Sequence, residues 1–296
     1  MSTYNGALYI REQINSILSQ KNLDIHVLVR DDGSKDETCS ILSEYVKSTG
    51  QVTLMVNNNI GCIASFCALA KEASENYPEY DYYAFSDQDD VWLDDKLYRG
   101  VKALEMHDSK YKLYASAYQM VDAELNNIPT QMMPAYYTFG EAMVMQPVPG
   151  CTMVFNLDML NLFVMAHPSQ MSMHDSWMYK VCLGVGGVFI YDPKPSILYR
   201  QHGNNVVGGS HTAIQRWKRR WNNWISGNCY RSKNAINLLS IYSDYIDNDN
   251  RRLLENLVGY QSSLLKKIRI LFSTSYRTKR IVTNILFKTA ILTNRY

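Results

Sequence analysis

The sequence predicts an α/β fold, in which a mostly parallel sheet is flanked by helices and is followed by an α-helical C-terminal extension. Short apolar runs alternate with helical patterns through the first half of the chain, as in parallel strands joined by helices. Polar clusters follow directly after these runs, at the strand ends where ligands of such sheets bind. The charge also changes along the chain: residues 1–211 hold 14 Lys and Arg against 24 Asp and Glu, whereas residues 212–296 hold 16 against 4.

The composition is that of a globular protein with two differently charged parts. With 46% hydrophobic and 20% charged residues, the chain can bury a sizeable core. Its six cysteines occur singly, without a CxxC pair, which favours a reducing cytoplasm over secretion. The apolar stretch 281–293 is interrupted by Asn284 and Lys288, so we expect no transmembrane helix, and no signal peptide is visible. We expect an α/β domain over residues 1–210 and a basic helical region over residues 211–296.

The first strands and helices are predicted from apolar runs and from the turn residues that follow them. Residues 1–6 form the end of a strand and its turn, and this strand is expected to be truncated. Each later strand is a continuous apolar or β-branched run that ends in an Asp- or Asn-rich turn. The predicted order after the first turn is a helix over residues 8–18, a strand over 25–29, a helix from Asp36 to Val46, a strand over 52–56 and a helix to about Ser74.

Residues 82–92, Tyr-Tyr-Ala-Phe-Ser-Asp-Gln-Asp-Asp-Val-Trp, are the stretch around which the chain is organised. A buried strand runs directly into three carboxylates, Asp87, Asp89 and Asp90. Neighbouring carboxylates raise one another's pKa unless a cation relieves them, and such oxygen ligands suit Mg²⁺ or Mn²⁺, which also bind phosphate oxygens. Taken alone, the segment leaves open a second interpretation, a solvated acidic loop.

The middle of the chain adds further regular elements and one irregular segment. A helix opens at Asp94, and residues 113–119 form a strand. Residues 126–146 have no clear period, and we expect a loop over the site. Residues 149–156 form a turn, a strand and the start of a helix, where Gly150 either allows a ligand to approach the backbone closely or simply makes the turn.

Three residues near the first two strand ends are candidates for binding a nucleoside. A carboxylate can accept a hydrogen bond from the ring N–H of uracil or thymine or bind ribose hydroxyls, and an aromatic ring can stack on the base. Tyr4, Asp31 and Asp32 offer these groups. The alternative is that the acidic pair belongs to an ordinary turn, with Ser34 or Asp36 capping the next helix. A dinucleotide or P-loop site has little support, because the sequence has neither GxGxxG nor a Walker loop.

Two later clusters carry further chemistry. In residues 173–177, Asp175 stands at the start of a predicted helix, where it is either a catalytic carboxylate or a helix cap. In residues 198–205, His202 is flanked by polar residues and glycine, and neutral imidazole is a common metal ligand. Arg200 could equally bind phosphate or form an internal salt bridge.

Five segments in this order resemble the bacterial family 2 glycosyltransferases, and among them the rhamnosyltransferases that build cell-wall, capsule or O-antigen polysaccharides. They are Ser-Thr-Tyr-Asn-Gly at 2–6, Arg-Asp-Asp-Gly-Ser at 30–34, Phe-Ser-Asp-Gln-Asp-Asp-Val-Trp at 85–92, His-Asp-Ser-Trp at 174–177 and Leu-Tyr-Arg-Gln-His at 198–202. Each motif alone is modest, whereas five in order are specific. The resemblance implies a GT-A (Rossmann-like) catalytic domain in residues 1–210, with a sugar nucleotide and a divalent cation at the carboxyl edge of the sheet.

By position, the resemblance also implies which residues bind the nucleotide. Thr3, Tyr4, Asp31 and Asp32 would hold the nucleoside, with Asp32 as the partner of the pyrimidine ring. Asp87 would lie near the ribose and the metal. This set is implied by the resemblance, since the turn interpretation of Asp31 and Asp32 remains open on the residues alone.

The same resemblance assigns the cation site and the base. Asp87 and Asp89 form the DxD signature, in which Asp89 coordinates the Mg²⁺ or Mn²⁺ that bridges the diphosphate, and His202 completes the metal or diphosphate site. Asp175 matches the catalytic base. Most family members have Glu-Asp at this point, and here His174 stands in place of the Glu.

A single positioned carboxylate predicts direct displacement with inversion at the anomeric carbon. The resemblance suggests dTDP-L-rhamnose as the donor and a polysaccharide or lipid-linked saccharide as the acceptor. Two alternatives remain: a family 2 transferase that uses a UDP-sugar, and a catalytically inactive sugar-nucleotide-binding or scaffold protein of the same fold.

Residues 212–230 contain a basic, tryptophan-rich pattern. Trp217, Trp221 and Trp224 fall on one helical face among Arg and Lys, which suits a helix at the membrane interface and equally a helix packed on the domain or on a second subunit. A lipid-linked acceptor favours the membrane, and hence a cytoplasmic enzyme at the inner face of the cell membrane. Nucleic acid is not an expected partner, because no RNA- or DNA-binding motif accompanies the basic region. The sequence does not predict the oligomeric state.

Overall fold

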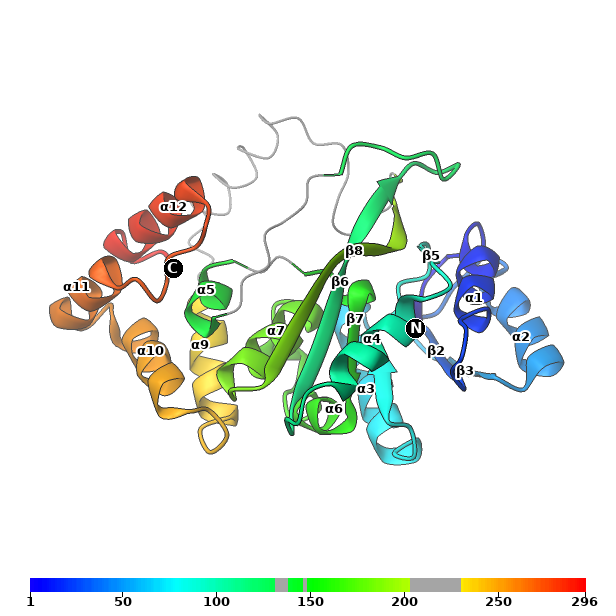
Figure 1. The fold of residues 1–296 in the computed structure, drawn as a ribbon, viewed down its shortest axis with the longest axis horizontal. Coiled ribbons are helices and arrows are strands. Elements are labelled where there is room, and N and C mark those ends of the chain that lie inside the picture. Colours follow the sequence, from blue (N-terminus) through cyan, green and yellow to red (C-terminus); the bar gives the residue numbers. More distant parts are fainter. Residues whose placement is uncertain (131–137, 146–147, 203–229) are drawn as a thin grey trace.

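The computed structural model describes residues 1–130, 138–145, 148–202 and 230–296, and its strands form two sheets (Figure 1). The first sheet is parallel and has the order β1 (Ser2–Thr3), β2 (Val27–Asp31) and β3 (Val52–Val56). The second has the order β4 (Tyr82–Ala84), β7 (Met153–Asn156), β6 (Lys112–Val121), β8 (Val188–Arg200) and β5 (Val91–Trp92). In the second sheet only β6 and β8 pair parallel, and the other neighbours pair antiparallel.

Helices connect and cover these strands, so the predicted α/β class is confirmed, with a mixed second sheet. The helices of the first part are α1 (Ile10–Leu18), α2 (Thr38–Thr49), α3 (Cys62–Asn76), α4 (Lys96–Glu105), α5 (Phe139–Val144), α6 (Leu157–Phe163) and α7 (His174–Gly184). Those of the last part are α9 (Tyr230–Ile241), α10 (Asn248–Gly259), α11 (Leu264–Phe272) and α12 (Ile281–Leu292). Short 3₁₀ turns lie at Gly150–Thr152 and Pro168–Gln170.

The register of the parallel sheet brings three polar turns to one edge. Thr3 pairs with Asp31, and Asp31 pairs in turn with Val56, so β1, β2 and β3 end side by side. The turns that follow them are joined by side-chain hydrogen bonds, such as that from the backbone N–H of Asn5 to Ser34 Oγ at 2.8 Å. This edge is where the sequence predicts the ligand site.

The long strand β8 joins the sheet to the acidic segment after β4. It runs parallel to β6 from Val188 to Arg200, and near its end Leu198 also pairs with Val91 of β5 in antiparallel fashion. β5 follows directly after Asp90, so the end of β8 lies beside the loop that connects β4 to β5. We call residues 85–90 the acidic loop.

The irregular loop predicted for residues 126–146 is partly wrong, because this range contains α5. The helix begins with a capping box, in which Thr138 Oγ1 accepts the backbone N–H of Glu141 and the Glu141 side chain accepts the backbone N–H of Thr138. A capping box satisfies two otherwise unpaired N–H groups and starts a helix even where the apolar period is short. Residues 131–137 lie outside the described part of the chain.

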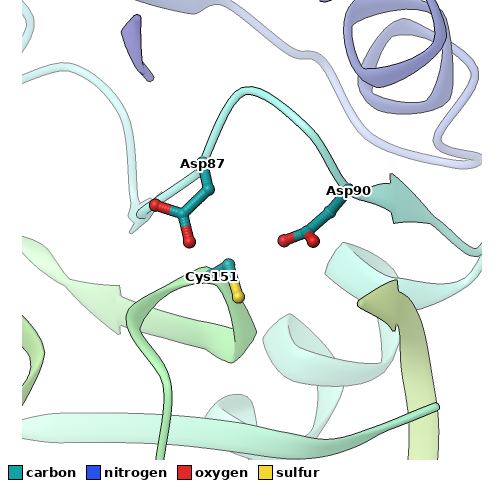
Figure 2. Close-up of side chains that lie close together, drawn as sticks. All are labelled: Asp87, Asp90 and Cys151. Atoms are coloured by element: carbon teal, nitrogen blue, oxygen red, sulfur yellow. The ribbon is translucent and has the colours of Figure 1, made fainter. Parts of the chain in front are cut away.

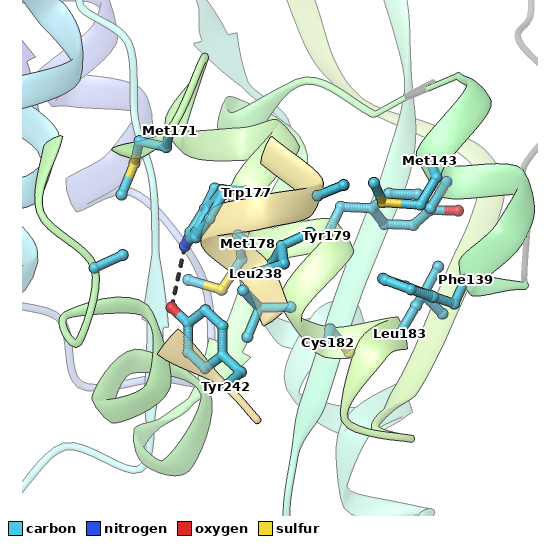
Figure 3. Close-up of a cluster of buried hydrophobic side chains, with 14 of the residues drawn as sticks. Phe139, Met143, Met171, Trp177, Met178, Tyr179, Cys182, Leu183, Leu238 and Tyr242 are labelled. Atoms are coloured by element: carbon cyan, nitrogen blue, oxygen red, sulfur yellow. Dashed lines mark hydrogen bonds between the residues drawn. The ribbon is translucent and has the colours of Figure 1, made fainter. Parts of the chain in front are cut away.

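The C-terminal helices share the main hydrophobic core with the α/β part. Figure 3 shows Trp177 of α7 beside Tyr242, which follows α9, and the Trp177 ring N–H donates to the Tyr242 hydroxyl at 3.1 Å. The Tyr242 hydroxyl donates in turn to the carbonyl of Leu162 in α6 at 2.9 Å. At the end of the chain, the Tyr296 hydroxyl donates to the carbonyl of Met143 in α5 at 2.9 Å. The helices after residue 230 therefore pack directly on α5, α6 and α7.

Within the described ranges, no helix is both long enough and apolar enough to cross a bilayer. The tryptophan-rich helix predicted within 212–230 lies outside those ranges apart from its last residue, and so does the expected contact of that helix with a membrane or a subunit.

If α10 belongs to the common core, truncating its buried side should destabilise the whole protein. Leu257→Ala removes a fully buried side chain, and we expect it to lower the free energy of unfolding by about 2–5 kcal/mol. Val258→Ala, one residue further and 37% exposed, is the matched control, and its effect should stay within about 0.5 kcal/mol. Urea denaturation followed by circular dichroism measures both. Equal midpoints for the two variants would contradict a common core.

Candidate active site

The acidic loop holds two carboxylates that face one cysteine. Asp87 and Asp90 stand at its two sides, and Figure 2 shows both beside Cys151 of the turn before β7. One ligand atom from each of the three residues lies within 4.8 Å of the others, an arrangement that could hold a metal ion. Asp90 accepts the backbone N–H of Arg200 at 3.2 Å, and its other oxygen, Oδ2, is buried without a hydrogen-bond partner among the described residues.

The electrostatics of this cluster favour a bound cation. Burial, followed by the charges of Asp89 and Asp175, raises the pKa of Asp87 to about 7. Burial, followed by Asp87 and Asp89, also raises the pKa of Asp90 well above its ordinary value. A carboxyl group with a raised pKa either keeps its proton or requires positive charge nearby. The carboxylate oxygens of the acidic loop therefore fit a divalent cation such as Mg²⁺ or Mn²⁺.

Of the three metal ligands predicted from the sequence, Asp89 and His202 lie together. His202 Nε2 is 2.8 Å from Asp89 Oδ2, and the imidazole also lies against the ring of Tyr9, with 5.0 Å between ring centroids. The third residue, Asp87, is near enough to Asp89 for the two charges to interact. Cys151 also lies in this cluster, although no sequence motif predicted it.

Arg200 positions the acidic loop. Its side chain is buried and forms a salt bridge with Glu12 of α1. Its Nε–H donates to the carbonyl of Asp89 at 2.9 Å, and another guanidinium N–H donates to the carbonyl of Ala123. The planar guanidinium also lies over the ring of Tyr9, 4.4 Å from its centroid. Of the two interpretations left open by the sequence, the internal salt bridge is the one observed.

A second side chain ties the acidic loop to the first turn of the chain. The amide of Gln88 accepts the backbone N–H of Tyr4 at 2.8 Å and donates to the carbonyl of Tyr4 at 3.1 Å. The Tyr4 side chain itself is 46% exposed, so its ring is free to stack on a ligand. Sequence patterns did not reveal this role of Gln88, because the two residues are 84 positions apart.

Asp175 lies in the first turn of α7 and faces the acidic loop. Met173 occupies the cap position, and an Asp175 oxygen accepts the backbone N–H of Ser176. The Asp175 charge contributes to the raised pKa of Asp87, which places the two carboxylates close together. The structure therefore brings together two residues that are 88 positions apart in the sequence.

His174, next to this carboxylate, is buried between aromatic rings. It stacks on Phe66 with 3.9 Å between ring centroids and meets Phe85 edge-on at 5.0 Å. Burial lowers its pKa, so the ring is neutral at neutral pH. Gly150 covers it closely, since a Cβ at residue 150 would lie 2.6 Å from His174 Nε2 and 3.3 Å from Asp175 Cβ. The missing side chain of Gly150 thus lets the backbone of this turn lie directly against His174 and Asp175.

The two aspartates of the second strand have partners within the protein. Asp31 accepts the Thr3 hydroxyl at 3.0 Å and the backbone N–H groups of Gly33 and Ser34 at 3.1 and 2.8 Å. Burial alone would raise the pKa of Asp31, but its hydrogen bonds from Ser34, Cys39 and Thr3 outweigh burial and lower it. Asp31 therefore stabilises the turn after β2, as expected if the acidic pair belongs to an ordinary turn. The base contact expected of Asp31 stays a prediction.

Asp32 connects the second strand to the start of α3. It forms a buried salt bridge with Arg30 and accepts the backbone N–H groups of Ile60 and Gly61, each at 2.8 Å. Nearby, burial raises the pKa of the Cys62 thiol to about 12, with Asp87, Asp175 and Asp32 as further causes. Because all three charges act on one thiol, the second strand, the acidic loop and α7 converge at the beginning of α3.

Known proteins are similar to this chain in sequence and in fold. The family model described as "Glycosyl transferase family 2" matches residues 1–158. A curated relative from Shigella flexneri, named dTDP-rhamnosyl transferase RfbG, is 30% identical over 249 residues, which cover 80% of this chain and 84% of the relative. An uncharacterised glycosyltransferase of Rickettsia prowazekii (strain Madrid E) is 21% identical over 229 residues, covering 75% of this chain and 69% of the relative.

Solved glycosyltransferase structures share the fold at lower identity. Residues 1–349 of S. aureus TarS in complex with UDP-GlcNAc superpose with a TM-score of 0.57 at 15% identity, covering all of this chain and 91% of that one. The mannosyltransferase PcManGT from Pyrobaculum calidifontis, with GDP-Man and Mn²⁺, gives a TM-score of 0.51 at 15% identity and covers 100% of this chain and 79% of its own. The fold is therefore GT-A. Together with the family match and the relative from Shigella flexneri, it shows that the chain belongs to glycosyl transferase family 2 and is a rhamnosyltransferase-like member of it.

Proposed function

We propose that the protein is an inverting, metal-dependent glycosyltransferase that moves L-rhamnose from dTDP-L-rhamnose to a saccharide acceptor. One observation carries the proposal: Asp175, at the start of α7, lies against the turn of Gly150 and Cys151, since a Cβ at Gly150 would be 3.3 Å from Asp175 Cβ, and Cys151 lies beside Asp87. In this proposal, a base and a cation-binding carboxylate would face each other. The transferred sugar would lie between them, with its diphosphate on the side of Asp87.

Asp175 would act as the base. It is half-buried, and the backbone N–H of Ser176 orients one of its oxygens. This carboxylate would take the proton from an acceptor hydroxyl while that oxygen attacks the anomeric carbon. Since one displacement inverts the configuration, a β-linked donor would give an α-linked rhamnoside. Both ring nitrogens of His174 are buried and burial lowers its pKa, so His174 is not the expected acceptor of this proton.

Asp87, Asp89 and His202 would hold the Mg²⁺ or Mn²⁺. Carboxylate oxygens and imidazole nitrogen suit Mn²⁺, and carboxylates suit Mg²⁺. The cation would neutralise charge that grows on the leaving diphosphate. Burial raises the pKa of Cys151 well above its ordinary value, so its thiol stays protonated and is a poor ligand beside these oxygens.

The nucleoside would bind along the edge formed by the first two turns. Tyr4 would stack on the base, while Thr3, Asp31 and Asp32 would line the nucleoside pocket, with Asp32 nearest the pyrimidine ring. The internal partners of the two aspartates hold them rigidly, which supports a preorganised pocket. Likeness to the relative from Shigella flexneri supports dTDP-rhamnose as the donor.

The acceptor would be a polysaccharide or a lipid-linked saccharide on the cytoplasmic side of the cell membrane. The tryptophan-rich residues 212–230 would contact the membrane, and liposome flotation with Trp217, Trp221 and Trp224 changed to Ala tests that contact.

Asp175→Asn should abolish most of the transfer while leaving donor binding unchanged. The amide can still accept the Ser176 N–H but cannot take the acceptor proton, so we expect kcat to fall by about 10²–10⁴ with little change in the donor KM. Transfer from dTDP-L-rhamnose with Mn²⁺ measures this, with the exposed Asp108→Asn as control. Full activity of Asp175→Asn would reject the base. A native chain that binds the donor without transferring it would instead support the inactive alternative.

Mn²⁺ affinity should rise with pH up to about 7 and then level off. The pKa of Asp87 is about 7, and a cation binds the deprotonated carboxylate, so below this pH binding must release a proton. We expect the apparent affinity to fall up to about tenfold per pH unit below about 7, as for one linked proton. Calorimetric titration measures it. Asp87→Asn should bind weakly without this slope, and an unchanged slope in that variant would contradict the role of Asp87.

The donor can be identified by thermal shift with Mn²⁺. We expect dTDP-L-rhamnose to raise the Tm more than UDP-sugars or GDP-mannose do, because binding to the native state alone stabilises it. Tyr4→Ala should weaken donor binding by roughly tenfold through the loss of ring stacking. Tyr98→Ala, also at an exposed tyrosine but on α4, serves as the matched control. A larger shift with a UDP-sugar would reject the proposed donor.

A further inference from the structure

Two neighbouring helices near the C-terminus expose an unusual amount of apolar surface. They are α11 and α12, which contact each other at the end of the molecule opposite α1 and α2 (Figure 1). Phe272, Ile281 and Leu264 are 83%, 76% and 73% exposed. The exposed apolar residues are Leu264, Leu265, Ile268 and Phe272 on α11 and Ile281, Val282, Ile285, Leu286 and Leu292 on α12. We call these nine residues the α11–α12 face.

Their spacing places them on one side of each helix. On α11 they recur at intervals of three and four residues from Leu265 to Phe272, and on α12 Ile281, Ile285 and Leu292 recur at four and seven. The opposite sides are buried: Ile270 on α11 and Phe287 and Ile291 on α12 belong to the main core. Each helix is thus held to the protein by one side and presents an apolar stripe on the other.

The surroundings of this face are positively charged. Residues 256–296 contain eight basic side chains and no Asp or Glu. They are Lys266, Lys267, Arg269, Arg277, Lys279, Arg280, Lys288 and Arg295. Lys288 lies on the exposed side of α12, where its long stem can cover apolar surface while the ammonium group reaches outward.

We propose that the α11–α12 face docks the protein on the surface of an anionic membrane. Apolar side chains on one side of a helix, with Lys and Arg around them, enter the boundary between headgroups and acyl chains of anionic lipids. A second copy of this chain fits less well, because two faces of the same positive charge would meet. The surface is distinct from residues 212–230, and it depends on neither the donor nor the base assigned above.

Vesicle flotation of the full chain tests the proposal. The chain should float with vesicles of phosphatidylcholine mixed with phosphatidylglycerol and much less with phosphatidylcholine alone. Changing Leu264, Phe272, Ile281 and Ile285 together to Ser should lower the partition coefficient on the order of a hundredfold. Changing Arg269, Arg277, Lys279 and Lys288 to Gln should lower binding to anionic vesicles by roughly fivefold per residue.

Matched controls use exposed residues elsewhere. Met106→Ser with Met165→Ser, and Lys47→Gln with Lys71→Gln, should leave flotation unchanged. Circular dichroism and the Tm verify that each variant is folded, and donor hydrolysis, read separately, should be equal in all of them. Flotation of the folded serine variant at the native level would overturn the proposal. The proposal would also be overturned if the native chain did not float, or if the native chain were a dimer and the serine variant a monomer.

Discussion

The buried guanidinium of Arg200 is the interaction on which the site depends. It joins the end of β8 to α1 through Glu12, and to the acidic loop through the carbonyl of Asp89. A buried cation must be fully paired, and each of its partners is therefore held in one place. Because Arg200 and His202 are separated by one residue, the same strand end that fixes the loop also delivers the imidazole to Asp89. Loss of this pairing would release the acidic loop and His202 together.

The loop that Arg200 fixes holds several carboxylates near one another. Asp87, Asp89 and Asp90 share a largely buried segment, and Asp175 faces it from α7. Their repulsion costs free energy in the folded state unless protons or a cation neutralise it. The folded chain therefore favours binding of a cation at this loop, where a cation could also neutralise a nucleoside diphosphate.

The sequence predicted the α/β class, the turn positions and the helix at His174, because apolar runs and the residues that end them are local signals. Contacts between residues that are distant in sequence could not be predicted in this way. The pairing of Gln88 with Tyr4 and the position of Cys151 beside Asp87 depend on how the turns pack together. α5 was missed because its start depends on a capping box and not on periodicity. The packing of the C-terminal helices into the common core was also unpredicted, since a change in net charge says nothing about burial.

In the proposed site, Asp87, Asp89 and His202 hold one cation in front of Asp175. Anomalous diffraction from a crystal grown with Mn²⁺ and dTDP tests it most directly. We expect a single manganese peak bonded to these three side chains and to the diphosphate, with no metal bonded to the Asp175 carboxylate. Manganese bound by Asp90 and Cys151 instead, or a diphosphate bound without manganese, would show that these three residues do not form the cation site.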